Sequence, residues 1–93
     1  MDTNEIMAAL EAILFAAGDP VPAERIAQVL GVETQRVYDA AETLKDALIA
    51  QGHGIRLLRM DNDLQLCSAP EYAQDITRAL EQRKPPRLSP AAL

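Results

Sequence analysis

The side chains best suited to catalysis or metal binding are isolated in this sequence. His53 is the single histidine and Cys67 the single cysteine of the 93 residues. A zinc site needs several such ligands at close spacing. The carboxylates are dispersed, and no glycine-rich phosphate loop or nucleophile motif accompanies them. We therefore predict no enzyme, with no catalytic residue, metal site or cofactor, and expect His53 in a loop and Cys67 buried in a strand as a small hydrophobic residue.

Residues 23–44 predict a helix-turn-helix, the unit whose second helix enters the major groove in many DNA-binding proteins. Apolar residues recur there at three- and four-residue spacing on both sides of Gly31. They are Ile26, Ala27 and Leu30 before the glycine, and Val37, Ala40, Ala41 and Leu44 after it. Gly31 supplies the positive φ that a tight turn between two closely packed helices requires.

The charge of the second of these helices is unfavourable for binding DNA. Residues 33–51 carry four carboxylates against two cations, namely Glu33, Asp39, Glu42 and Asp46 against Arg36 and Lys45, and the whole chain has a net charge of −5. Phosphate binding depends on clustered Lys and Arg, so little or no sequence-specific DNA binding is expected. The alternative is a winged-helix transcriptional regulator that binds DNA through Gln35, Arg36 and Thr43, with Arg56 and Arg59 in the minor groove.

The elements that position these residues follow from capping and periodicity. The first helix is expected from Asn4, as N-cap, to Ala17, with Gly18 ending it. Its core stripe is Ile6, Leu10, Ile13, Leu14 and Ala17. Residues 18–22 are expected to form a loop, and Pro22 to open a second helix that ends at Leu30. Thr34 is the expected cap of a third helix that continues to about Ala50.

A β-hairpin and a closing helix are expected after residue 54. Residues 54–60 and 64–68 alternate around a turn at residues 61–63, with Ile55, Leu57, Leu64 and Leu66 facing inward. Pro70 opens a fourth helix, ending near Arg83, whose apolar residues Tyr72, Ile76 and Leu80 are expected to cover the core. This order of elements predicts an α+β, mainly α winged-helix domain over residues 1–83.

Residues 84–93 are predicted to be a proline-rich linker followed by the start of a second winged-helix domain. Ser89 and Pro90 have the types expected at the N-cap and first position of a new helix.

The single cysteine and the absence of a signal peptide point to a reducing cytosol. The longest apolar run is too short to cross a bilayer, so a soluble cytoplasmic protein is expected.

The first helix is apolar around most of its circumference. If its core stripe faces inward, the opposite side still carries Ala8, Ala12, Phe15 and Ala16, interrupted by Glu5 and Glu11. A helix of this kind is covered on both sides. Either the fourth helix or the hairpin covers the second face, or a second protein chain does. In the second case we predict a protein interface made of Ala8, Glu11, Ala12, Phe15 and Ala16, with Phe15 as anchor.

Three segments resemble the bacterial segregation and condensation protein B family: ILFAAGDPVPAERIAQVLGV, DLQLCSAPEY and PPRLSPAAL. The resemblance covers essentially the whole chain, and its two ends are more specific than the helix-turn-helix between them. Members of that family have two winged-helix domains joined by a proline-rich segment, so the chain resembles the first domain, the linker and the first residues of the second domain.

The resemblance implies a non-enzymatic accessory subunit of the chromosome-organising condensin complex. Such proteins form homodimers through their N-terminal domains. They also bind the kleisin subunit, segregation and condensation protein A, which bridges the heads of the SMC ATPase. The family's kleisin contacts draw heavily on the second domain, so homodimerisation is the activity expected of this part. A nucleoid-associated place in the cytoplasm follows from the same resemblance.

Overall fold

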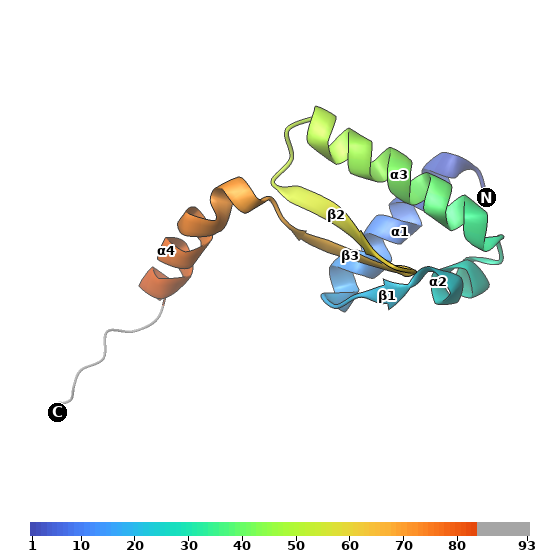
Figure 1. The fold of residues 1–93 in the computed structure, drawn as a ribbon, viewed down its shortest axis with the longest axis horizontal. Helices are drawn as coiled ribbons and strands as arrows, with labels where there is room; N and C mark the ends of the chain where they lie inside the picture. Colours follow the sequence, from blue (N-terminus) through green and yellow to red (C-terminus); the bar gives the residue numbers. More distant parts are fainter. Residues whose placement is uncertain (84–93) are drawn as a thin grey trace, which may run out of the picture.

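The computed structural model describes residues 1–83, which form a helical layer packed on a small antiparallel sheet (Figure 1). The helices of the body are α1 (Thr3–Ala17), α2 (Ala23–Leu30) and α3 (Thr34–Ala50). The strands, in the order β1-β3-β2, are β1 (Val21–Pro22), β2 (Ile55–Met60) and β3 (Asp63–Ser68). A 3-10 turn, η1 (Pro70–Tyr72), leads into α4 (Ala73–Arg83). The winged-helix prediction is confirmed, and the β2–β3 hairpin is the wing. The predictions for residues 84–93 lie outside the described residues.

Helix α1 begins earlier than predicted because Asp2, and not Asn4, is its N-cap. The Asp2 Oδ1 accepts the Glu5 N–H at 2.8 Å, and the Glu5 Oε1 accepts the Asp2 N–H at 2.9 Å. This reciprocal pair needs an acidic or amide side chain three residues after the cap, and Asn4 is followed there by Met7. Gly18 ends the helix as predicted, with a φ of 72°.

The segment predicted as a loop before α2 contains the short strand β1. Val21 pairs with Leu64 and Pro22 with Asp63. Pro22 is the extended N-cap of α2 and not its first helical residue. A strand of two residues has no alternation, which explains why periodicity missed it. Similarly, Thr34 is the first residue of α3 and its N-cap is Glu33.

The core lies between α1, α2, α3 and one face of the wing. Its buried residues include Ile6, Leu10 and Leu14 of α1, Ile26 and Ala27 of α2, Val37, Ala40, Ala41, Leu44 and Leu48 of α3, and Leu57 and Leu64 of the hairpin. The predicted helix-turn-helix stripe is therefore buried, apart from the half-buried Leu30. In α1 the predicted stripe is too wide by Ala17, which is exposed, while Ile13 is half-buried and packs against the core.

The wing is fully paired but only partly covered. Its turn consists of Asp61 and Asn62, and Asp63, predicted in the turn, pairs with Met60 as the first residue of β3. Ile55 and Leu66 lie on the same face as Leu57 and Leu64, as the alternation predicts. However, Ile55 is 42% exposed and Leu66 is half-buried. Leu66 packs against the edge of the core as predicted, whereas the prediction that Ile55 is a core residue was wrong, because the helices leave this face of the wing partly uncovered.

Helix α4 does not cover the core as predicted. Figure 1 shows it extending away from the body. Tyr72, Ile76 and Leu80 are 44%, 36% and 48% exposed, respectively. The chain turns outward at Ala69, which is fully buried and donates its N–H to the Gly54 carbonyl at 2.8 Å. Among residues 1–83, no helix is both long and apolar enough to cross a membrane.

The tight turn between α2 and α3 supplies a test of this local structure. Gly31 has a φ of 69°, and a Cβ added there meets no atom within 4 Å, so the only cost of Gly31→Ala is backbone strain. We expect Gly31→Ala to lower the free energy of unfolding by about 1–2 kcal/mol in urea denaturation at a fixed protein concentration. Gly54→Ala is the matched control, because Gly54 has the same free space without the positive φ. An equal loss in both variants would contradict this explanation.

Candidate protein-interaction surface

The five residues predicted as an interface all lie on the exposed side of α1. We call Ala8, Glu11, Ala12, Phe15 and Ala16 the α1 patch; each of them is exposed. Phe15 is 81% exposed, more than any other large hydrophobic residue in the described part of the chain. The inward side of the same helix is sealed, since Ile6, Leu10 and Leu14 are at most 1% exposed. Neither the hairpin nor α4 covers the α1 patch, so the intramolecular alternative was wrong.

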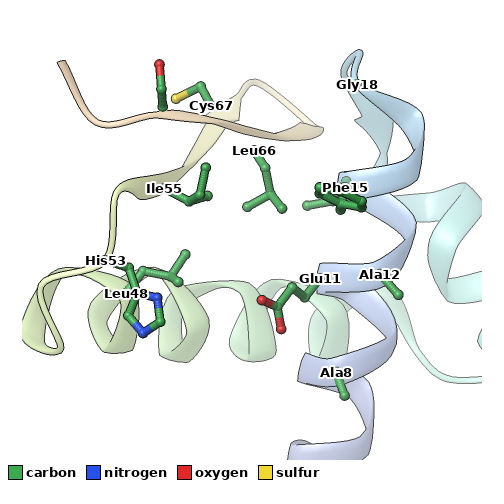
Figure 2. A pocket seen from close by; sticks show the side chains of 12 residues that line it. Ala8, Glu11, Ala12, Phe15, Gly18, Leu48, His53, Ile55, Leu66 and Cys67 are labelled. Atoms are coloured by element: carbon green, nitrogen blue, oxygen red, sulfur yellow. The ribbon is translucent and has the colours of Figure 1, made fainter. Parts of the chain in front are cut away.

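The α1 patch forms one wall of a hollow of about 530 Å³ between α1 and the wing (Figure 2). Ala8, Glu11, Ala12 and Phe15 line it, and Ala16 lies outside it. The opposite wall comes from the C-terminal end of α3 and the open end of the hairpin, with Leu48, His53, Ile55, Leu66, Cys67 and Ser68. Ile55, Leu66 and Phe15 lie in a row across the hollow in Figure 2. The sequence missed the second wall because alternation assigned Ile55 and Leu66 to the core.

The chemistry of the hollow suits the burial of apolar side chains. Its ionisable groups are Glu11, His53 and the half-buried Cys67. The His53 Nε2 lies 3.2 Å from the Gln51 Oε1. Within residues 1–83, no three His, Cys, Asp or Glu side chains are grouped as a metal site would require. An apolar depression with a charged rim is typical of a surface that binds polypeptide.

Two of the three α3 side chains that the DNA-binding alternative requires are engaged on their own helix. The Gln35 Nε2 donates to the Asp39 Oδ1 at 3.0 Å, and the Thr43 Oγ1 donates to the Asp39 carbonyl at 3.1 Å. A base contact through Gln35 would therefore compete with a hydrogen bond to a carboxylate on its own helix. The acidic side chains also remain exposed, as Asp39, Glu42 and Asp46 all are.

The two arginines of the wing make contacts within the domain. The Arg59 guanidinium lies 3.9 Å from the centre of the Tyr38 ring, and its Nε donates to the Asp61 carbonyl at 3.1 Å. The Tyr38 hydroxyl donates to the Asn62 Oδ1 at 3.1 Å, so the tip of the wing is fastened to α3. Arg56 instead fastens the base of the wing. Its Nη1 donates to the His53 carbonyl at 2.7 Å, and its Nη2 lies 3.3 Å from the Glu71 Oε2.

Comparison with known proteins shows to which family the chain belongs. The family described as "Segregation and condensation complex subunit ScpB" matches residues 8–93. The chain belongs to this family. Among curated ScpB proteins, that of Syntrophotalea carbinolica is 38% identical over the whole chain, and that of Moorella thermoacetica is 34% identical over 98% of it. The chain spans about half the length of these relatives, 47% and 46%, respectively.

Solved ScpB structures have the same fold. ScpB from Mycobacterium tuberculosis aligns with a TM-score of 0.86 at 22% identity, over 97% of this chain and 56% of that one. A structure described as a dimer of the ScpB N-terminal domain complexed with a ScpA peptide aligns with a TM-score of 0.76 at 28% identity. It covers 82% of this chain and 95% of that chain. The winged helix found here is thus the N-terminal domain fold of the ScpB family.

The wing contacts supply a second test. We expect Arg59→Ala to lower the free energy of unfolding by about 0.5–1 kcal/mol, because it removes the cation–π contact with Tyr38. Arg25→Ala is the matched control, since Arg25 is exposed on α2 and makes no side-chain hydrogen bond or ion pair within residues 1–83. Thermal and urea denaturation measure both variants. Equal stability of the two would show that Arg59 is not engaged in solution.

Proposed function

We propose that this ScpB-family domain is a homodimerising protein-interaction module of the bacterial SMC–kleisin condensin complex. In this role it is a non-enzymatic accessory part, acts in chromosome condensation and segregation, and works in the cytoplasm at the nucleoid. The observation that carries the proposal is the exposed Phe15 at the edge of an apolar hollow. Family membership supports the place of the domain in the complex.

The α1 patch supports self-pairing as one part of a larger contact surface. Burying a phenylalanine side chain contributes about 1.5–3 kcal/mol, and a two-fold pair gains this twice because the same surface is used on both copies. The alanines at positions 8, 12 and 16 recur every four residues, so they form a narrow stripe that lets another backbone approach closely. In the related structure with 28% identity, the ScpB N-terminal domain is described as a dimer.

The second partner we propose is the kleisin, segregation and condensation protein A, and through it the SMC ATPase. The same related structure is described as complexed with a ScpA peptide. That complex contains an N-terminal domain alone, which supports a kleisin contact on this domain in addition to any made by a second domain.

The dimer proposal is tested by Phe15→Glu. We expect the native chain to be a dimer at tens of micromolar and the variant to be a monomer, because a carboxylate cannot be buried at the centre of an apolar contact. Light scattering coupled to size-exclusion chromatography measures the mass. Val29→Glu is the matched control, since Val29 is 72% exposed on α2, away from the α1 patch.

Two outcomes would overturn the dimer proposal. One is a native chain that stays monomeric at this concentration. The other is a Phe15→Glu variant with the same mass as the native chain. Circular dichroism melting shows whether each variant is folded, and a folded monomer is required of Phe15→Glu.

The alternative of a DNA-binding regulator is tested by salt dependence. We expect no tight binding of duplex DNA by the native chain at physiological salt, because Arg56 and Arg59 are engaged within the domain and α3 is acidic. Fluorescence anisotropy with a labelled duplex measures this. Tight binding that weakens steeply as salt rises would require several neutralised phosphates and would favour the regulator instead.

A further inference from the structure

The C-terminal helix of the described region has an apolar stripe without a partner. We call Tyr72, Ile76 and Leu80 the α4 stripe. Tyr72 is the last residue of η1, which runs directly into α4, and the three residues recur every four positions, a spacing that brings side chains to one side of a helix. All three are exposed, and η1 is the element that α4 chiefly contacts. An amphipathic helix of eleven residues has little stability in water by itself, because short helices depend on packing of their apolar face. A partner for the α4 stripe is therefore expected.

The segment that precedes α4 is fixed to the base of the wing. Ala69 is fully buried and hydrogen-bonded to Gly54, and Arg56 pairs with Glu71 in η1. Ser68, which lines the hollow, lies two residues before η1, so the helix leaves the body beside the hollow. Figure 1 shows that it then extends outward. To fill the hollow of its own chain, α4 would have to reverse this direction.

The α1 patch by itself is too small for a stable dimer. A specific interface buries at least about 1,200 Å² in total and engages some 20–30 residues a side. The α1 patch contains one large apolar side chain, Phe15, beside three alanines and Glu11. Adding the α4 stripe and the second wall of the hollow gives each copy Phe15, Ile55, Leu66, Tyr72, Ile76 and Leu80. That set of apolar side chains, doubled by symmetry, is typical of a homodimer interface.

We propose that each copy packs its α4 stripe into the hollow of a second copy, so that two chains exchange their C-terminal helices across a two-fold axis. This inference rests on the proposed homodimer and specifies its contact. Each chain supplies one helix and one hollow, so both are satisfied in a closed pair and no surface is left over to add a third copy. Exchange of an identical element is a route to dimers that needs no new element in either chain.

Chemical cross-linking between two variants tests the exchange. In a Cys67→Ser background, one variant carries Ala12→Cys in the hollow and the other Ala79→Cys beside the α4 stripe. The two are given different masses by a tag, mixed, and treated with a short bifunctional thiol reagent. Gln74→Cys replaces Ala79→Cys in the matched control, because residue 74 lies on the opposite side of the helix. We expect the mixed product to form several-fold more with residue 79 than with residue 74.

The outcomes separate this inference from the proposed dimer. Equal or absent mixed cross-linking while light scattering still shows a dimer would overturn the exchange and leave the dimer standing. A monomer in light scattering would overturn both. A chain carrying Ala12→Cys and Ala79→Cys together that links within itself at monomer mass would show that α4 folds onto its own hollow, which also overturns the exchange. Circular dichroism melting of each variant confirms that the fold is intact.

Discussion

The structure depends on the burial of one side of α1 against α3 and the wing. Ile6, Leu10 and Leu14 are at most 1% exposed, and they are among the largest side chains fully buried in the described residues. With three aromatic residues in the whole chain, the core is built from aliphatic side chains and alanines. Such a core is small, and it closes with one side of α1 inside. The remaining apolar side of α1 cannot be covered by the same core, which leaves the α1 patch in solvent.

The parts of the fold that were predictable from sequence are those governed by local rules. The spacing around Gly31 gave both helices of the helix-turn-helix because each buries a single stripe on a neighbour close in sequence. The outward position of Phe15 was predictable for the same reason, since an angle around a helix fixes which residues oppose the core. The N-cap of α1 was missed although it is local, because Asp2 and Asn4 are both good caps and only the Glu5 contact separates them.

The predictions that failed concern how elements distant in sequence pack against one another. Alternation placed Ile55 and Leu66 on the correct face of the wing, yet how far the helices extend over that face is decided by packing. Helix α4 ends at Arg83 as predicted, but it begins at Ala73 after a 3-10 turn and not at Pro70, and it was wrongly placed in space. Its direction is set by the contacts of Ala69 with Gly54 and of Glu71 with Arg56, and no pattern within residues 70–83 contains that information. The second wall of the hollow was missed for the same reason.

Charge argues against DNA binding by this domain, although its fold is common among DNA-binding proteins. The cations of the wing are used internally, with Arg59 on Tyr38 and Arg56 on Glu71, and α3 presents carboxylates where phosphates would lie. The Arg56–Glu71 pair also joins the base of the wing to η1, from which α4 continues. Cations that are engaged in contacts within the domain are less available to phosphates. The same contacts join the wing to its neighbours, and rigid elements position interaction surfaces better than loops.

The two sides of α1 are energetically separable, which bears on why the α1 patch exists. The helix is fixed by the Asp2–Glu5 capping pair, by Gly18 and by its three buried residues, none of which belongs to the patch. Phe15 therefore contributes little to folding of the single chain, while its exposure adds a hydrophobic surface that favours association. Folding alone gives no reason for a phenylalanine at this position. The proposed contact with another polypeptide supplies one, and the hollow beside Phe15 offers space for it.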